Sequence, residues 1–256
     1  MLLAVDVGNT QTHLGTFEGS ELRESWRFQT RAGMTSDEIA ERISGFMGLS
    51  GMSLADVTAV CVSSVVPPLG TQYTRLCQRY LDGGECLLVG PGIKTGMPIR
   101  IDNPYEVGAD RLVNAVAAYE RFGGACVVVD FGTGINFDAV SQQGEYLGGA
   151  IAPGVEISLT ALAQRGARIP QIDLAKPDAA IGKSTRAAIE SGVMFGFAGL
   201  IDGVSRRIIG ELGEGTPIIA TGGLAAAIVP YCDTISEIDD LLTLTGLRII
   251  WQRNTG

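Results

Sequence analysis

Histidine is almost absent from this sequence, which has a single one, His13, among its 256 residues. Only this one histidine could therefore serve as a base for a serine or cysteine nucleophile, or as a ligand in a histidine metal site, which argues against both. A carboxylate has to serve as the base. The five cysteines are odd in number and include no Cys-x-x-Cys pair, so neither a disulfide framework nor a zinc site is indicated.

Basic residues and long apolar runs are also scarce. There are 19 lysines and arginines against 28 acidic residues, which gives a net charge of −9 and argues against binding to nucleic acid or an anionic membrane. The most apolar helical stretch is bracketed by Glu190 and Asp202, and it is shorter than the about 20 residues that a bilayer span needs. The N-terminus lacks the basic segment of a signal peptide. We expect a cytoplasmic protein with no membrane segment and with small-molecule partners.

A strand followed by a turn occurs twice in the sequence. Residues 2–10 predict a buried strand that ends in Asp6-Val7-Gly8-Asn9-Thr10, and residues 127–133 predict another that ends in Asp130-Phe131-Gly132-Thr133. Glu21-Leu22 follows Asp6 at the same distance as Glu145-Tyr146 follows Asp130. Two segments of equal layout indicate a duplicated α/β domain, with halves at 1–122 and 123–256.

The residue types in these turns suit phosphate binding. Glycine has no Cβ, so the backbone N–H groups at Gly8 and Gly132 can approach a phosphate oxygen closely, and the hydroxyls of Thr10, Thr12 and Thr133 add donors. Carboxylates repel a polyphosphate, so Asp6 and Asp130 are compatible with phosphate binding only if a cation or an ordered water lies between the carboxylate and the phosphate. The alternative is that each Asp-x-Gly is an ordinary turn.

The rest of each half predicts further strands and helices. Expected strands are 12–17, 22–28, 57–63, 86–89, 125–130, 135–140, 146–151 and 217–220, and expected helices are 68–80, 107–122, 155–163, 185–212 and 241–251, with one more after a Thr35 capping box with Glu38. The 165–178 segment contains two prolines and predicts a mobile loop, or one that is ordered by substrate.

Asp110 is the strongest candidate for chemistry, because it opens a predicted helix beside Arg111 at the junction of the halves. The alternative is a carboxylate that only complements the helix dipole. Gly182-Lys183-Ser184-Thr185 has the ending of a phosphate-binding P-loop, but Pro177 stands where that motif requires glycine. We therefore interpret Ser184 or Thr185 as a helix N-cap.

Four motifs together resemble the type III pantothenate kinases. They are Asp6-Val7-Gly8-Asn9-Thr10, the 104–111 segment Pro-Tyr-Glu-Val-Gly-Ala-Asp-Arg, Asp130-Phe131-Gly132-Thr133 with Asp138, and the 148–154 segment Gly-Gly-Ala-Ile-Ala-Pro-Gly. The resemblance implies the duplicated actin-like fold of the acetate and sugar kinase, chaperone and actin superfamily, with two similar halves around a cleft. It also implies ATP-dependent phosphorylation of pantothenate to 4′-phosphopantothenate, the first step of coenzyme A biosynthesis.

The resemblance also assigns roles to particular residues. Asp110 is expected to be the general base, and Asp130 the ligand of a monovalent cation, potassium or ammonium, with Mg²⁺ accompanying ATP. Gly134 and Asn136 stand at positions where the family usually has Ala and Thr, and these differences affect the expected affinity for the nucleotide. His13 is interpreted as a structural or peripheral group within the ATP-binding segment. Substrate binding is expected at Gly108, Ala109, Asp110, Arg111 and Thr185, and ATP binding at Asp6, Val7, Gly8, Asn9, Thr10, Gln11, Thr12, His13 and Thr133.

The 185–212 helix carries Gly192, Gly196, Gly199 and Gly203 on an otherwise apolar element. Glycine in a helix costs about 1 kcal/mol relative to alanine, so four of them indicate close packing against another backbone. That backbone lies either in the same chain or in a second copy. The resemblance implies a homodimer whose substrate site lies near the interface. A catalytically silent relative that acts as a regulator or scaffold is the alternative function.

Overall fold

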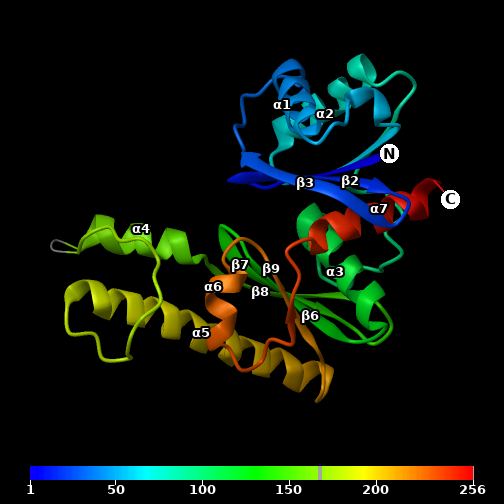
Figure 1. Ribbon diagram of the computed structural model, residues 1–256. Coiled ribbons are helices and arrows are strands. Elements are labelled where there is room, and N and C mark those ends of the chain that lie inside the picture. The colour runs from blue at the N-terminus through cyan, green and yellow to red at the C-terminus, as the bar shows by residue number, and fades with distance from the viewer. Residues whose placement is uncertain (167–168, 256) are drawn as a thin grey trace. The chain divides into compact units, whose positions relative to one another are not determined.

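The computed structural model describes residues 1–166 and 169–255 (Figure 1). Contacts divide the chain into two units. The first consists of Met1–Met97, Asp102–Ala117 and the segment from Leu241 onward, and the second consists of Pro98–Ile101 and Ala118–Asp240. This division differs from the predicted boundary after residue 122, because the C-terminal helix belongs to the first unit.

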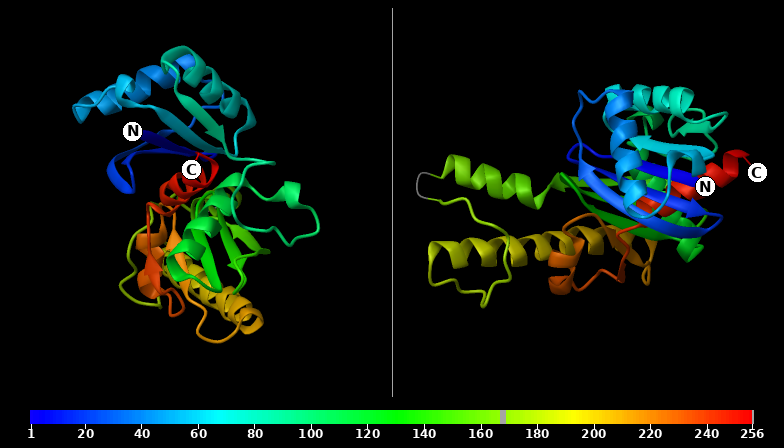
Figure 2. Two further views of the ribbon diagram at one scale, coloured as in Figure 1. Left: turned by 90° about the vertical axis from the view of Figure 1, so that its right-hand side faces the viewer. Right: turned by 45° about the horizontal axis from the view of Figure 1, so that its top comes forward.

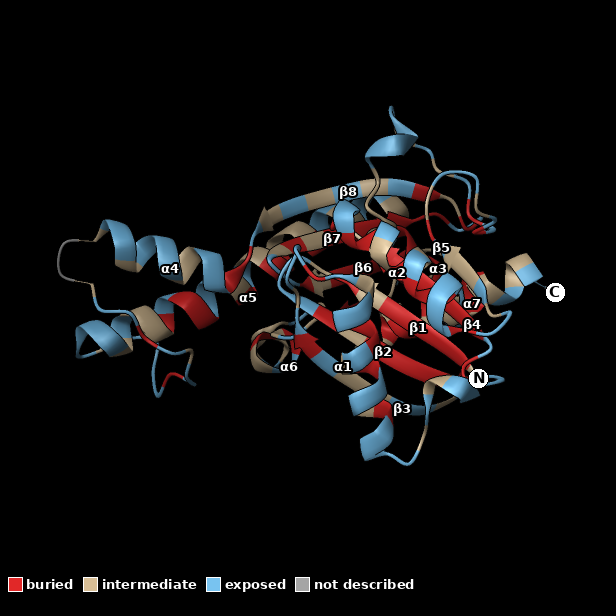
Figure 3. Ribbon diagram, turned by 90° about the horizontal axis from the view of Figure 1, so that it is seen from above, coloured by how far each residue is buried: buried red, intermediate tan, exposed pale blue. Residues whose placement is uncertain are grey.

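The first unit is built on a five-stranded sheet with the order β3-β2-β1-β4-β5. Its strands are β1 (Leu2–Val7), β2 (Gln11–Glu18), β3 (Glu21–Gln29), β4 (Ala59–Ser64) and β5 (Glu85–Leu88). The first three form an antiparallel meander, whereas β4 pairs parallel with both β1 and β5. β1 is almost fully buried (Figure 3). It lies in the centre of this sheet, and helices pack against it from both faces.

Helices cover both faces of the first sheet (Figure 1). α1 (Ser36–Leu49) and α2 (Pro67–Tyr80) enclose one apolar core with β1 and β4, and α7 (Leu242–Thr255) packs against β1, β2 and β4. The predicted capping box of α1 is present, since the Thr35 hydroxyl accepts the Glu38 N–H and the Glu38 carboxylate accepts the Thr35 N–H. α3 (Ala109–Phe122) begins in this unit and continues into the second after Ala117.

The second unit repeats the same plan with the order β10-β9-β6-β7-β8. Its strands are β6 (Cys126–Phe131), β7 (Gly134–Val140), β8 (Tyr146–Pro153), β9 (Ile218–Thr221) and β10 (Glu237–Ile238). β6, β7 and β8 form the antiparallel meander, and β9 pairs parallel with both β6 and β10. Each strand of the first sheet therefore has a counterpart at the same place in the second, which confirms the predicted duplication.

The helices of the second unit are α4 (Val155–Arg165), α5 (Thr185–Leu212) and the short α6 (Ala225–Ile228). α5 contributes Val193, Met194 and Ile201 to a core with β6, β7 and β9, and its first turns run beside α4 (Figure 2). The length and apolar composition of α5 also suit a membrane span. Core helices have the same length and composition, and one side of α5, which includes Asp202 and Ser205, is buried within the unit.

Several elements differ from the sequence expectations. Three 3₁₀ turns, Leu54–Asp56, Pro104–Glu106 and Val229–Tyr231, were not predicted, and neither were α6 and β10. The predicted 165–178 loop includes residues 167 and 168, which lie outside the described residues. From 169 to 184 the described chain contains no helix or strand.

Candidate active site

The first phosphate turn joins β1 to β2. The Gly8 N–H donates to the Gln11 carbonyl at 3.0 Å, and a Cβ on Gly8 would lie 2.9 Å from that same oxygen. Any side chain at Gly8 would thus open the turn. The side chains of Asn9, Thr10 and Gln11 are exposed at its tip, where a ligand can reach them.

Asp6 lies at the end of β1 in a row that crosses the first sheet. It pairs with His13 of β2 on one side and with Ser63 of β4 on the other. Burial, together with the nearby charge of Arg27, lowers the pKa of His13 to about 4, so this imidazole is neutral at pH 7. The Thr12 side chain is buried, and its hydroxyl shares a hydrogen bond of 2.9 Å with that of Thr30.

Asp130 occupies the position in the second sheet that Asp6 occupies in the first. It pairs with Asn136 of β7 and with Thr221 of β9. In the turn that follows, the Gly132 N–H donates to the Gly134 carbonyl at 3.0 Å, and Thr133 is exposed. Gly154 donates to the Thr133 carbonyl at 3.2 Å and fits there because it has no Cβ.

Asp110 lies in the first turn of α3, in the first unit. Its Oδ1 accepts the backbone N–H of Arg111 at 2.8 Å. Burial raises the pKa of the Asp110 carboxyl, an effect that the Arg111 amide and charge partly offset. Burial makes this carboxylate a stronger base than an exposed one, which suits proton transfer.

Thr185 is the first residue of α5 and is exposed. Ser184 is the N-cap, because its hydroxyl accepts the Ala187 N–H at 3.1 Å. The preceding segment folds back onto the helix, with the Ser191 hydroxyl donating to the Ala180 carbonyl at 2.6 Å. Gly182 packs so tightly on the first turn of α5 that a Cβ there would collide with it. This geometry is that of a helix cap and not of a P-loop, because no strand occurs in the described residues 169–181 that lead into Gly182.

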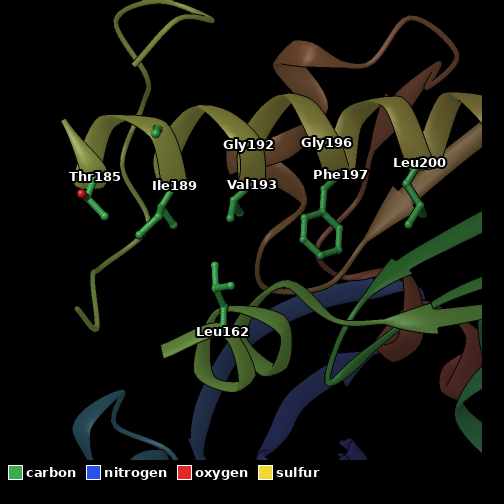
Figure 4. A pocket seen from close by; sticks show the side chains of 9 residues that line it. Leu162, Thr185, Ile189, Gly192, Val193, Gly196, Phe197 and Leu200 are labelled. Atoms are coloured by element: carbon green, nitrogen blue, oxygen red, sulfur yellow. The ribbon is translucent and has the colours of Figure 1, made fainter. Parts of the chain in front are cut away.

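An apolar groove of about 490 Å³ lies between α4 and α5. Leu162 of α4 points toward α5, and the side chains of Ile189, Val193, Phe197 and Leu200 point back from α5 (Figure 4). Gly192 and Gly196 also line this groove, and within the described chain nothing lies within 4 Å of a Cβ built on either. We call this feature the α4–α5 groove; its polar end is Thr185.

The predicted site residues thus fall into separate groups. The first phosphate turn and Asp110 belong to the first unit, whereas Asp130, Thr133 and Thr185 belong to the second. Sequence reasoning did not name Ser63 as a site candidate, and it considered Asn136 only for its effect on nucleotide affinity, not as a neighbour of Asp130. The signal for them is the strand order, which pairs each with an aspartate across the sheet.

The chain is also similar in sequence to proteins of a known family. The profile of the type III pantothenate kinase family matches residues 2–207. A type III pantothenate kinase from Anaeromyxobacter sp. (strain K) is 49% identical over 99% of this chain and 100% of its own length. One from Moorella thermoacetica is 48% identical over the full length of both chains.

A solved structure shows the likeness in fold. The chain is similar to the inorganic polyphosphate/ATP-glucomannokinase from Arthrobacter sp. strain KM, with a TM-score of 0.52, 14% identity and 98% coverage of both chains. At that identity the likeness concerns the fold alone. It confirms the duplicated actin-like ATPase fold predicted from the sequence.

Proposed function

This chain belongs to the type III pantothenate kinase family, and we propose that Asp110 is the general base of its reaction. The reaction is the ATP-dependent phosphorylation of pantothenate to 4′-phosphopantothenate, the first step of coenzyme A biosynthesis. The observation that carries the proposal is the environment of Asp110, where burial raises the carboxyl pKa and the Arg111 amide holds Oδ1.

In the proposed mechanism, the pantothenate hydroxyl oxygen attacks the γ-phosphorus of ATP while the bond from that phosphorus to the β–γ bridging oxygen breaks. The transition state of such transfers is loose, so the hydroxyl keeps its proton until late and then gives it to Asp110. The carboxylate therefore mainly orients the hydroxyl. Gly108, Ala109, Arg111 and Thr185 are the proposed substrate-binding residues, with the Arg111 side chain supplying positive charge.

ATP is proposed to bind through the two phosphate turns. The supporting features are the Gly8 turn, whose tip side chains are exposed, and the exposed Thr133 after β6. A kinase that uses ATP implies a divalent ion such as Mg²⁺, which neutralises phosphate charge when bound. Asp6 is proposed to accept a hydrogen bond from a water molecule bound to the Mg²⁺ ion. Asp130 is proposed to bind the monovalent cation, potassium or ammonium.

A homodimer is the proposed working assembly, with a second copy covering the α4–α5 groove. Gly192, Gly196, Gly199 and Gly203 recur at three- and four-residue intervals, which places them along one side of α5. A Cβ at the first three would meet nothing within 4 Å in the described chain. The groove is lined mainly by apolar side chains, and Phe195 on the same helix is exposed. Because Thr185 lies at the end of the groove, assembly and substrate binding would be linked.

The proposed compartment is the cytoplasm, since the scattered cysteines are all free thiols in the structure. The comparisons give no support to the alternative of a catalytically silent regulator.

An assay of purified enzyme with pantothenate, ATP, magnesium and potassium tests the function. We expect ADP formation that depends on pantothenate, together with a product heavier by one phosphoryl group in mass spectrometry. ADP formation that does not respond to pantothenate would contradict the assigned acceptor.

A further inference from the structure

Three oxygen-bearing side chains lie side by side across the second sheet. Asp130 on β6 is directly opposite Asn136 on β7 and directly beside Thr221 on β9. Directly paired residues in a sheet project from the same face, with Cβ atoms about 4.5–5.5 Å apart. A carboxylate, an amide and a hydroxyl therefore form one continuous row, at the end of β6 that leads into the second phosphate turn.

Gly222 closes one side of this row. Its φ is +95°, and a Cβ atom there would lie 2.6 Å from Oδ1 of Asp130 and 2.7 Å from the Phe131 nitrogen. Only glycine fits this position, both for its backbone conformation and for the space available. The backbone after β9 thus lies directly against the Asp130 carboxylate and fixes its position.

The chemistry of the row suits a hard cation of low charge. Carboxylate, amide and hydroxyl oxygens are ligands for hard cations, and potassium is commonly held by carbonyl oxygens that replace its hydration shell. The row carries a single carboxylate. In the described parts of the chain, no three His, Cys, Asp or Glu side chains gather where they could hold a metal ion. A singly charged ion therefore matches the row better than a transition metal does.

The equivalent row in the first sheet lacks this chemistry. There Asp6 is flanked by His13 and Ser63, and Arg27 follows His13 in register. A neutral imidazole takes the place of the amide, and a guanidinium adds positive charge beyond it. In the second sheet the residue that follows Asn136 in register is the uncharged Ile151. The two rows have the same topology, but the one at Asp130 has an amide where the other has an imidazole, and Ile151 where the other has a guanidinium.

We propose that Asn136 and Thr221 are ligands, together with Asp130, of the monovalent cation, and that Asn136 sets its affinity. This inference rests on the proposed cation site at Asp130 and adds two residues to it. Asn136 contributes its amide oxygen, and Thr221, which is buried, contributes its hydroxyl oxygen.

Thermal unfolding of the substrate-free enzyme tests the proposal without relying on activity. Potassium chloride replaces choline chloride at constant ionic strength, and the unfolding temperature should rise with potassium because the ion binds the native state. Asn136→Leu, which keeps the size and removes the oxygen, should raise the potassium concentration at half-effect by about 10-fold or more. Thr221→Val should shift it in the same direction, and Asn136→Asp, which keeps an oxygen, should not weaken it. Gln143→Ala, at the far end of β7 and β8, is the matched control.

The outcomes separate this proposal from the cation site itself. Unchanged potassium curves in both Asn136→Leu and Thr221→Val, with a lost response in Asp130→Asn, would overturn the added ligands and leave Asp130 in place. A wild-type enzyme without any potassium response, or an Asp130→Asn variant with a normal one, would overturn the cation site and this inference with it. Because Thr221→Val is nearly isosteric, it serves as the test if Asn136→Leu does not fold.

Discussion

A Cβ atom on Gly108 would lie 2.5 Å from Oδ1 of Asp110, the carboxylate oxygen that accepts the Arg111 amide. Gly108 does not have a positive φ, so alanine is acceptable to its backbone and the conflict is with the side chain alone. The first prediction is that Gly108→Ala displaces the Asp110 carboxylate. Misplacing a reacting group by about 1 Å costs about 100-fold in rate, and we expect a loss of that order in kcat/KM for pantothenate.

Gly45→Ala is the matched control for this variant. Gly45 is exposed in α1, and a Cβ there meets nothing within 4 Å. Steady-state kinetics should be unchanged in the control, with a small gain in unfolding temperature from the better helix propensity of alanine. Normal kinetics in the Gly108→Ala enzyme would show that the position of the Asp110 carboxylate does not limit the reaction.

The second prediction concerns turnover in Asp110→Asn. The amide keeps the shape and can still accept the Arg111 N–H, but it cannot take a proton. Removal of a general base lowers turnover by about two to four orders of magnitude. Asp102→Asn, on the exposed segment before α3, is the control and should keep normal turnover. Near-normal turnover in Asp110→Asn would remove this residue from the mechanism.

The third prediction follows from the raised pKa of Asp110. A carboxyl whose pKa is higher in the folded than in the unfolded state contributes stability below its unfolded pKa, and that contribution is lost as the pH rises through the folded pKa. Asp110→Asn should therefore unfold at a higher temperature than wild type at pH 7, with the difference shrinking as the pH falls toward 3.8, the ordinary value of the group. Wild-type turnover should fall with pH through the same raised pKa. A lower unfolding temperature for the variant at pH 7 would count against a desolvated carboxylate.

The sequence predicted most of this fold because its signals are local. The Thr35 capping box, the alternating apolar strands and the repeated Asp-x-Gly each depend on neighbouring residues. The placement of α7 could not be predicted in this way. α7 packs against α3 at Gly246, where a Cβ would collide with the Val113 backbone, and nothing near Gly246 in the sequence points to Val113. β10 has two residues, too few for any periodic pattern.

For the candidate site, the sequence pointed only to residues that belong to short motifs. Asp6, Asp110 and Asp130 belong to short motifs whose residue types are typical of phosphate binding or proton transfer. The motifs do not show that Asn136, Thr221 and Gly222 adjoin Asp130, because Asn136 comes beside it only through the register of the hairpin, and Thr221 and Gly222 come from a strand distant in sequence. Their contribution depends on register, and a shift of one residue would place Asn136 on the opposite face of the sheet.

The fourth prediction concerns Asp202, a buried carboxylate on α5 that lies outside the proposed active site. It accepts the backbone N–H groups of Asp233 and Thr234 at 3.0 Å and the Thr234 hydroxyl at 2.8 Å. These bonds outweigh the cost of burial and lower the pKa of Asp202, so its stabilisation is present at neutral pH and lost as the pH falls through the lowered value. Asp202→Ala should reduce the free energy of unfolding by about 1.5–3 kcal/mol at pH 7. Asp233→Ala, which removes an exposed ion pair with Arg206, should cost far less, and equal losses in denaturant titrations would argue against this account.

The last prediction is that the dimer forms through the α4–α5 groove. Gly196 lines this groove, and a Cβ built on it meets nothing within 4 Å in the described chain, so the monomer has room for the first atom of a leucine side chain. In a dimer that places a second helix against this surface, the same leucine overpacks the contact at a cost of about 1–3 kcal/mol. Gly196→Leu should therefore elute as a monomer or a weakened dimer in size-exclusion chromatography with light scattering, with normal circular dichroism and a raised KM for pantothenate.

Gly45→Leu, at an exposed and unobstructed site in α1, provides the control for added apolar bulk and should stay dimeric with normal kinetics. The KM for pantothenate tests whether the groove supports substrate binding as well as dimer formation. Thr185 lies at one end of the groove, so an interface that supports the substrate site would link assembly to pantothenate affinity. A Gly196→Leu enzyme that remains dimeric with an unchanged KM would place the partner elsewhere on the surface. One that becomes monomeric and keeps its KM would retain the interface but break its link to catalysis.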